Sequence, residues 1–464
     1  MIRLFSRYWS APAALSLSIE GLLLLLAVPF ATYLRLGIGP GSPPPPLQVS
    51  MEGLLFMVVG LLSLYINGLY DFGERLPTRR LTICLARAFT LGALALFAFY
   101  FLIPTAVPGR GVFLLAFLFA VPGVVAWRFL LRLLLKSESF AERVLIVGTD
   151  EKAIDIARET LARRHLGYRV VGFLDDDPKI QGLSLLNPRV IGTTRQAREL
   201  AMLHGATRVV VAGFDSRGRV SMDSLLECKT SGVKVQEGSS FYEQLTGKIM
   251  IEGLRKSWLI FSDGFVVSRG VLFGKRLLDL TVASIGLVLA APLMLAVALA
   301  VRLDSPGPVL FRQERLGRRG KPFKLWKFRS MRTDAEASSG PAWAVQGDPR
   351  VTRVGRFIRK TRLDELPQLW NVLVGDMSLV GPRPEREMFV KQLLETNPFY
   401  EQRMVVRPGL TGWAQIKAPY ASSFEESIEK LKFDLYYIKN LSLFLDISIL
   451  LSTARTVLLG RGAR

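Results

Sequence analysis

Cysteine and histidine are scarce in this sequence, and their scarcity excludes several kinds of chemistry. Among 464 residues there are two cysteines, Cys84 and Cys228, and two histidines, His165 and His204. These four residues provide neither a disulfide framework nor the Cys/His spacing of a zinc site. Both histidines lie in the middle of the chain, far from the charged motifs near its C-terminus. Chemistry in that region is therefore not expected to use a histidine base, a thiolate or zinc.

Acidic residues are also few. The chain has 39 of them against 60 lysines and arginines, which gives a net charge of +21 and a pI near 10.2. Half of all residues are hydrophobic. This combination is typical of a membrane protein with basic cytoplasmic surfaces, or of a protein that binds polyanions. The length is sufficient for two or three domains.

Four apolar runs lie in the N-terminal part of the chain, at 14–34, 52–70, 84–104 and 111–131. Each is close to the ~20 residues that a helix needs to cross a bilayer. The first run begins too late, and lacks the small-residue site, for a cleaved signal peptide. Arginines precede this run and follow the second, whereas 37–50 has neither lysine nor arginine. We therefore predict a four-helix transmembrane bundle over 1–137 with both ends in the cytoplasm. Glu20, inside the first run, is open to a functional or a helix-packing interpretation.

A fifth apolar run spans 280–301 and is also long enough to cross a membrane. Lys275 and Arg276 precede it, and lysine and arginine far outnumber acidic residues in the sixty residues that follow it. Basic flanks on both sides favour the cytoplasm for both ends. Pro292 removes a helical hydrogen bond in the middle of the run and permits a sharp break. We predict a re-entrant helix hairpin over 277–301, with a Pro-kinked fifth span as the alternative.

The middle of the chain alternates strand and helix patterns. "RVLIVG" at 143–148 is typical of a buried strand, and an amphipathic helix pattern follows at 153–164. This alternation continues and predicts a parallel, Rossmann-like α/β domain over 138–266. Dinucleotide binding needs Gly-x-Gly-x-x-Gly, but Gly148 is followed by Asp150 and Glu151, which repel phosphates. We expect a structural, regulatory or dimerising domain with a degenerate nucleotide site.

Two adjacent carboxylates, Asp364 and Glu365, stand in the strongly basic stretch "RKTRLDELPQLWN". Acids at a helix start are ordinary, since they suit the helix dipole and act as caps. However, Arg359 and two further cations directly precede the pair. Cations in this number suit phosphates, and they predict a carboxylate with a low pKa that is ready to act as a nucleophile.

From about Phe273 to its C-terminus the chain resembles the bacterial sugar transferases, the monotopic phosphoglycosyl transferases. The motifs that carry the resemblance are "GKRLLDL", "PLMLAVALAVRLDSPGPVLFRQERLGRRGKPFKLWKFRSMR", "RLDELPQLWNVLVGDMSLVGPRPE", "RPGLTGWAQI" and "FDLYYIKNLSLFLDISILL". Upstream, "NGLYD" and "WLIFSDGF" are similar to the large members of this family, which start exopolysaccharide, capsule or O-antigen units. The resemblance implies a monotopic α/β catalytic domain over 267–464. It also implies transfer of a sugar 1-phosphate from a UDP-sugar to undecaprenyl phosphate, with release of UMP.

The resemblance assigns roles to individual residues. Asp364 matches the aspartate that attacks the β-phosphorus and carries the sugar phosphate covalently, and Glu365 matches a carboxylate associated with Mg²⁺. The residues expected to bind substrate are the phosphate-contacting Lys327, Arg329 and Arg359, the Pro-Arg-Pro residue Arg383, and the pocket walls Arg407, Thr411 and Trp413.

The same resemblance implies partners and a location: a lipid bilayer, a homodimer and the bacterial inner membrane, with the catalytic domain on the cytoplasmic face. A nucleic-acid partner is not expected, because it would not explain five apolar runs. Two other functions stay open, a membrane-bound nucleotide-sugar dehydratase or reductase and a non-catalytic assembly scaffold. The sugar is also open between glucose, galactose and an N-acetylated hexosamine.

Overall fold

The computed structural model describes most of the chain, which divides into two compact units. The described residues are 2–4, 7–9, 11–36, 47–70, 77–103, 110–134, 141–163, 166–212, 221–252, 259, 262, 264–266, 268–333, 348, 350–418 and 423–458. One unit comprises residues 1–4 and 8–246, and the other comprises 5–7 and 247–464. The predicted boundary at 266 therefore falls inside the second unit. The reason is packing, because Ile249 and Ile251 are buried in the same hydrophobic cluster as Val380 and Leu445.

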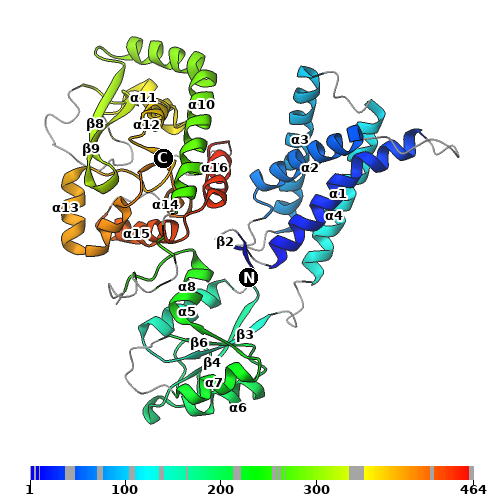
Figure 1. The fold of residues 1–464 in the computed structure, drawn as a ribbon, viewed down its shortest axis with the longest axis vertical. Coiled ribbons are helices and arrows are strands. Elements are labelled where there is room, and N and C mark those ends of the chain that lie inside the picture. The colour runs from blue at the N-terminus through cyan, green and yellow to red at the C-terminus, as the bar shows by residue number, and fades with distance from the viewer. Residues whose placement is uncertain are drawn as a thin grey trace. The chain divides into compact units, whose positions relative to one another are not determined.

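Four apolar helices form a bundle in the first unit, as predicted (Figure 1). They are α1 (Ala11–Leu36), α2 (Leu47–Ile66), α3 (Thr78–Leu102) and α4 (Arg110–Leu134), and two short strands, β1 (Ile2–Leu4) and β2 (Arg7–Trp9), precede them. By length and composition α1, α3 and α4 are sufficient to cross a membrane, whereas the apolar part of α2, Met51–Ile66, is shorter. Buried alanines on α1 and α4, such as Ala27 and Ala116, let these helices approach closely. Of the segment 37–50, which lacks lysine and arginine, residues 37–46 lie outside the described residues and 47–50 form the start of α2.

Glu20 is fully buried in this bundle and has a cationic partner. Its carboxylate lies 2.5 Å from Nε of Arg128 on α4 and accepts a 2.6 Å hydrogen bond from the Tyr70 hydroxyl. Arg128 also donates to the Leu69 carbonyl, at 2.6 Å. A buried charge is tolerated in apolar surroundings when it is paired and hydrogen-bonded in this way. The contacts favour the helix-packing interpretation of Glu20.

A five-stranded, all-parallel sheet follows, which confirms the predicted parallel α/β arrangement. Its order is β5 (Val190–Gly192), β4 (Tyr168–Leu174), β3 (Glu142–Val147), β6 (Arg208–Val211) and β7 (Lys234–Glu237). The connecting helices are α5 (Glu151–Ala162), α6 (Ala197–Leu203), α7 (Met222–Thr230) and α8 (Gly238–Thr246), with short 3₁₀ turns η4 (Pro178–Ile180) and η5 (Thr194–Gln196). Contacts join α5 to α8 and α6 to α7. The Asp150 carboxylate accepts from the Ala153 N–H at 2.9 Å, so an acid caps α5 at the place where a dinucleotide fold binds phosphate. His165 lies outside the described residues.

The second unit builds a mainly helical domain around two small sheets (Figure 1). Strands β8 (Leu310–Leu316) and β9 (Pro322–Phe328) are antiparallel, and β10 (Ser378–Val380) and β11 (Gly409–Thr411) are parallel. The helices are α10 (Arg269–Asp304), α11 (Arg353–Lys360), α12 (Gln368–Val374), α13 (Glu387–Thr396), α14 (Trp413–Lys417), α15 (Phe424–Lys439) and α16 (Leu443–Leu458). Short 3₁₀ turns complete it: η6 (Arg318–Gly320), η7 (Leu363–Glu365) and η8 (Pro398–Met404).

Helix α10 contains the fifth apolar run and is by composition also sufficient to cross a membrane. Helical structure continues through Pro292, and Figure 1 shows the helix changing direction between its two ends. The N-terminal arm is anchored by buried charges: Lys275 donates to the Val380 carbonyl at 2.8 Å, and Asp279 accepts from Ser378 Oγ at 3.0 Å. The C-terminal arm packs Val297 and Val301 against Phe328 and Ile358. Both arms therefore contact the same domain.

Candidate active site

The Asp-Glu pair lies in the tight turn between α11 and α12. Thr361 ends α11, since its hydroxyl donates to the Phe357 carbonyl at 2.8 Å and does not cap the following helix. Arg362 has a φ of 62°, a left-handed conformation that is uncommon outside glycine. This residue reverses the chain and starts the 3₁₀ turn η7, which contains Asp364 and Glu365. The pair therefore stands on a strained turn and not on a regular helix start.

Glu365 is held by cations. Its Oε1 lies 2.8 Å from Arg383 Nη2, 3.3 Å from Lys327 Nζ and 3.8 Å from Arg362 Nη1. Burial alone raises the pKa of this carboxyl, but the charges of Arg383, Lys327 and Arg362 outweigh burial and hold the pKa well below its usual range. Glu365 thus stays ionised and fixes two of the predicted substrate-binding side chains, Arg383 and Lys327.

Asp364 has the opposite character. The residue is 7% exposed, and among the described residues its carboxylate accepts no hydrogen bond and forms no ion pair. Burial raises its pKa above the ordinary 3.8, against the lowering effect of Lys327 and with a further rise from Glu365. The predicted low pKa was therefore wrong for Asp364, because desolvation outweighs the nearby cations, and it holds for Glu365. Within the described part of the chain, the carboxylate oxygens of Asp364 are therefore not engaged by another side chain or by the backbone.

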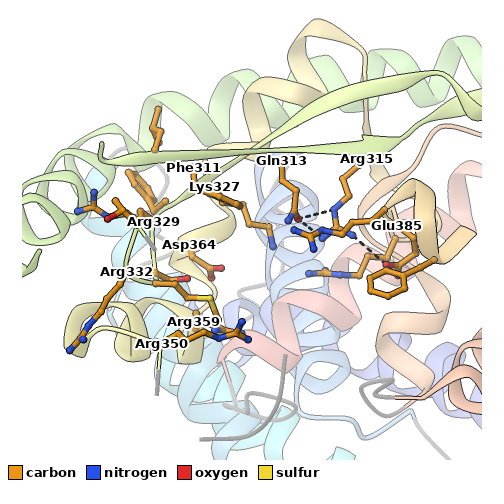
Figure 2. A pocket seen from close by; sticks show the side chains of 18 of the residues that line it. Phe311, Gln313, Arg315, Lys327, Arg329, Arg332, Arg350, Arg359, Asp364 and Glu385 are labelled. Carbon is orange, nitrogen blue, oxygen red and sulfur yellow. Dashed lines mark hydrogen bonds and ion pairs between the residues drawn. The ribbon is translucent and has the colours of Figure 1, made fainter. Parts of the chain in front are cut away.

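A cavity of about 580 Å³ opens beside Asp364 (Figure 2). Two of the described residues that line it are carboxylates, Asp364 and Glu385. The lining also includes ten cationic side chains: Arg315, Lys327, Arg329, Arg332, Arg350, Arg359, Arg383, Arg386, Arg403 and Lys430. Such an excess of positive charge in a confined space suits a ligand that carries several phosphate charges.

One face of the β8–β9 ribbon forms a wall of this cavity. Register pairs Phe311 with Lys327, and strand alternation puts Gln313 and Arg315 on the same face (Figure 2). The outer face carries other side chains, among them Arg312, whose guanidinium lies 4.0 Å from the Trp326 ring centre. The lysines and arginines of 311–332 therefore lie on both faces of the ribbon, and many of these side chains line the cavity.

Four of the predicted substrate-binding residues come together at the cavity: Lys327, Arg329, Arg359 and Arg383. Of these, Arg329 is 5% exposed and also secures the end of α10, since its Nη2 donates to the Ser305 carbonyl at 2.6 Å. Its Nε and Nη1 are buried and have no hydrogen-bond partner among the described residues. Arg329 thus lines the cavity and at the same time anchors the end of α10.

Arg407, Thr411 and Trp413 do not line this cavity, contrary to their predicted role as pocket walls. Thr411 lies in β11 and shares a 2.6 Å hydrogen bond with Thr453. Trp413 is buried, stacks on Tyr436 and donates from Nε1 to the Gly247 carbonyl at 2.9 Å. They do not reach the cavity because the Arg-Pro-Gly-Leu-Thr segment packs against the Pro-Arg-Pro loop that lines it.

This support acts on the Pro-Arg-Pro loop. Gly381 N–H donates to the Thr411 carbonyl and Gly409 N–H donates to the Pro382 carbonyl, each at 2.9 Å. The backbones approach so closely that a side chain at Gly381 would collide with the Arg407 carbonyl. The loop that presents Arg383 is therefore pinned to β11.

Several lining residues were not predicted, and most come from distant segments. Arg403 of η8 is the best connected: its Nη2 donates to the Asp434 carboxylate at 2.9 Å and to the Arg383 carbonyl at 3.1 Å, and its Nη1 donates to the Tyr400 hydroxyl. Arg315 lies within 3.4 Å of Glu385. The period-2 alternation of 311–315 was a usable signal for Arg315, whereas nothing local in the sequence indicated Arg403 or Lys430.

A profile of the family described as bacterial sugar transferase matches residues 271–460. The exopolysaccharide production protein PSS of Rhizobium leguminosarum bv. phaseoli is 44% identical over 187 residues, which make up 39% of this chain and 92% of that protein. The chain therefore belongs to the bacterial sugar transferase family.

Two further relatives carry more specific names. The UDP-N-acetylgalactosamine-undecaprenyl-phosphate N-acetylgalactosaminephosphotransferase of Aeromonas hydrophila is 46% identical over 240 residues, 52% of this chain and 56% of that protein. The UDP-glucose:undecaprenyl-phosphate glucose-1-phosphate transferase of Escherichia coli K12 is 47% identical over 181 residues, 39% of each chain. The chain thus matches about half or less of the length of these two relatives, and their names specify different sugars.

Proposed function

We propose that this chain transfers a sugar 1-phosphate from a UDP-sugar to undecaprenyl phosphate, releases UMP, and starts a surface polysaccharide in this way. The observation that carries the proposal is Asp364, a buried carboxylate that faces a strongly cationic cavity and has no hydrogen-bond or ion-pair partner among the residues that the structure describes. The names of the two relatives support the substrate classes, since both specify a UDP-sugar donor and undecaprenyl phosphate as acceptor.

Asp364 is proposed as a nucleophile in a double displacement. One of its carboxylate oxygens attacks the β-phosphorus of the donor, and the bond from that phosphorus to the bridging oxygen breaks, so UMP leaves with the electron pair. An oxygen of the prenyl phosphate then attacks the same phosphorus and displaces the Asp364 carboxylate. Lys327, Arg359 and Arg383 act on Asp364 through their charge and suit the phosphate oxygens at which negative charge accumulates.

Magnesium fits this site as a cofactor. Mg²⁺ takes oxygen ligands and is usually held by one or two carboxylates together with substrate phosphates and water. The oxygen donors at this site are the adjacent carboxylates Asp364 and Glu365, and Oε1 of Glu365 is already paired with Arg383 and Lys327; no group of three or more Asp, Glu, His or Cys residues gathers among the described residues. Glu365 would hold the ion, which would neutralise charge on the diphosphate.

We also propose that α10 enters the membrane as a re-entrant hairpin. Its two arms contact one domain, through Lys275 and Asp279 on one side and Val297 and Val301 on the other. Leu366, next to the Asp-Glu pair, packs against both hydrophobic clusters that hold these arms. Between the arms, Val288, Leu289 and other apolar side chains are exposed. A crossing helix separates its ends by the ~30 Å of a bilayer core, which opposes shared contacts with one compact domain.

Turnover tests the proposal. Purified protein in nanodiscs receives undecaprenyl phosphate, Mg²⁺ and a panel of UDP-sugars, and UMP release is measured. We expect release with at least one sugar, dependent on the lipid and abolished in Asp364→Asn, because an amide cannot form the phosphoryl ester. The control is Asp376→Asn, the same change at an exposed aspartate outside the cavity, which keeps full activity. Near-normal activity in Asp364→Asn excludes the covalent mechanism.

A further inference from the structure

A short segment that follows α8 in the chain is packed into the second unit. It comprises residues 247–252 and is here called the strap. The strap precedes residue 271, where the match to the family begins. Its Ile249 and Ile251 are buried in the main hydrophobic cluster of the second unit. The strap is therefore part of this unit's packing and not a free linker.

The first contact of the strap is with Trp413. The Gly247 carbonyl accepts a 2.9 Å hydrogen bond from Trp413 Nε1. Gly247 has a φ of 67°, and a Cβ atom at this position would lie 3.1 Å from the Trp413 ring, so glycine is needed for this close approach. Trp413 starts α14, one residue beyond the end of β11, the strand that pins the loop of Arg383. Through Trp413 the strap thus supports the strand that holds this loop.

The second set of contacts is with α15. The Lys248 ammonium donates to the Glu429 carboxylate and lies 5.0 Å from the centre of the Phe433 ring. The Ile249 N–H donates to the Lys432 carbonyl at 3.0 Å. A carbonyl within a helix that accepts from another segment fixes that segment against the helix backbone. The strap is therefore tied to α15 by its backbone as well as by side chains.

Ion pairs close the strap onto α15. The Lys432 ammonium binds Glu252 at the end of the strap and lies 2.9 Å from the Glu429 carboxylate, which also accepts from Lys248. Burial raises the pKa of Glu429, but the hydrogen bonds from Lys248 and Lys432 outweigh burial and lower the pKa. Charges of alternating sign thus join the two segments, and a network of this kind is stronger than one exposed pair.

Helix α15 carries its cavity residues on another face. Ser427 and Lys430 line the cavity, and Asp434 binds Arg403, which lines it as well. These three α15 positions are three and four residues apart, so they share one helix face. At 100° per residue, the positions that the strap contacts lie on the roughly opposite face. A displacement of α15 at the strap therefore moves the residues at the cavity.

The two sets of contacts reach two arginines of the cavity. Arg383 depends on β11 and Trp413, and Arg403 depends on Asp434 of α15. Among the described residues that line the cavity, none belongs to the strap. We propose, on the basis of the proposed sugar-phosphate transfer, that the strap is a positioning element of the active site. It holds α14 and α15 and thereby fixes Arg383 and Arg403 for phosphoryl transfer.

Lys248→Met tests the contact with α15 in the full chain in nanodiscs. UMP release is measured at saturating UDP-sugar and undecaprenyl phosphate, at temperatures where the protein is folded. A displacement of about 1 Å can cost on the order of a hundredfold in rate, so we expect kcat to fall about tenfold while KM for both substrates stays unchanged. Lys248→Arg keeps the charge and should restore kcat. Lys391→Met is the control, because it breaks a Lys–Glu pair on α13 that is 70% and 55% exposed.

Gly247→Ala tests the contact with Trp413. The new methyl group strains the backbone and presses on the indole ring, and kcat should again fall about tenfold by misplacement of the reacting groups. Gly232→Ala is the matched control, since Gly232 has a similar left-handed φ of 87° but no described atom within 4 Å of a Cβ atom there. It carries the same kind of backbone strain and should leave kcat unchanged.

Hydrogen–deuterium exchange provides a readout that does not depend on turnover. Lys248→Met and Gly247→Ala should each speed the exchange of backbone amides in 381–385 or 427–434, and the two control variants should not. Strap variants with a lower melting temperature but an unchanged kcat would show a merely structural role and overturn the proposal, while UMP release by the unmodified protein leaves the proposed function intact. Absence of UMP release from the unmodified protein contradicts the proposed function, and unchanged exchange in both strap variants then overturns the strap independently.

Discussion

The buried pair of Arg403 and Asp434 allows a prediction with a magnitude. Their side chains are 8% and 3% exposed and lie 2.9 Å apart, and burial raises the pKa of Asp434 against the lowering effect of Arg403. Arg403→Met leaves Asp434 buried without its partner. Removing one member of such a pair costs about 3–5 kcal/mol of unfolding free energy, because the remaining charge is uncompensated.

A loss of unfolding free energy of this size can be measured by thermal unfolding. About 3 kcal/mol corresponds to a fall of roughly 6 °C or more in the melting temperature of a domain of this length. Thermal unfolding in detergent is compared for Arg403→Met, Asp434→Asn and the double variant. Arg403→Met leaves the charge of Asp434 unpaired, and Asp434→Asn removes that charge. The double variant should therefore lose less stability than the sum of the two single changes.

A second readout separates stability from positioning. Arg403 donates to the carbonyl of Arg383, whose side chain binds Glu365. We expect kcat of Arg403→Met to fall at temperatures where the protein is fully folded, because the Pro-Arg-Pro loop loses this support. Additive stability losses, or a loss below about 1 kcal/mol for Arg403→Met, would refute the reasoning from burial.

Two further predictions concern the nucleophile and the membrane helix. Because the pKa of Asp364 is raised and the proposed attack requires its ionised form, kcat/KM should fall with decreasing pH along a limb whose midpoint lies above 3.8. Lys327→Met should move this midpoint upward, and Lys324→Met on the outer face of β9 should not; a pH–rate profile with no acid limb above 3.8 contradicts the assignment. For the hairpin, cysteines placed at Phe273 and Leu303 in a protein freed of its two native cysteines should both react with an impermeant maleimide from the cytoplasmic side. Labelling of the two positions from opposite sides would show that α10 crosses the membrane.

The elements were predictable where a pattern is local. Apolar runs long enough for membrane helices became α1 to α4 and α10, and alternating strand and helix patterns became the parallel sheet. The short strands β5 and β7 were not predicted, since each is three or four residues long and has little periodicity of its own. The packing of Ile249 and Ile251 with the second unit was not predictable, because it depends on contacts with segments distant in sequence.

The site was predictable in its centre and not at its periphery. Asp364, Glu365 and the four cations beside them lie in contiguous motifs that can be identified directly in the sequence. The pKa of Asp364 depends on its burial, which a string of neighbouring arginines does not reveal. The supporting positions of Thr411 and Trp413 were not predictable either. Thr411 accepts a backbone hydrogen bond from Gly381, and Trp413 stacks on Tyr436, and in both pairs only the fold brings the two residues together.

Side chains of the β8–β9 ribbon alternate between its two faces, and one of these faces forms a wall of the cavity. Substitutions at positions such as Gln313 alter the chemistry of the cavity, whereas those at Arg312 or Lys324 alter the opposite surface. The backbone hydrogen bonds that hold the strands together depend on neither. The ribbon can therefore accept a change in the side chains that line the cavity without a change in the side chains on its other face.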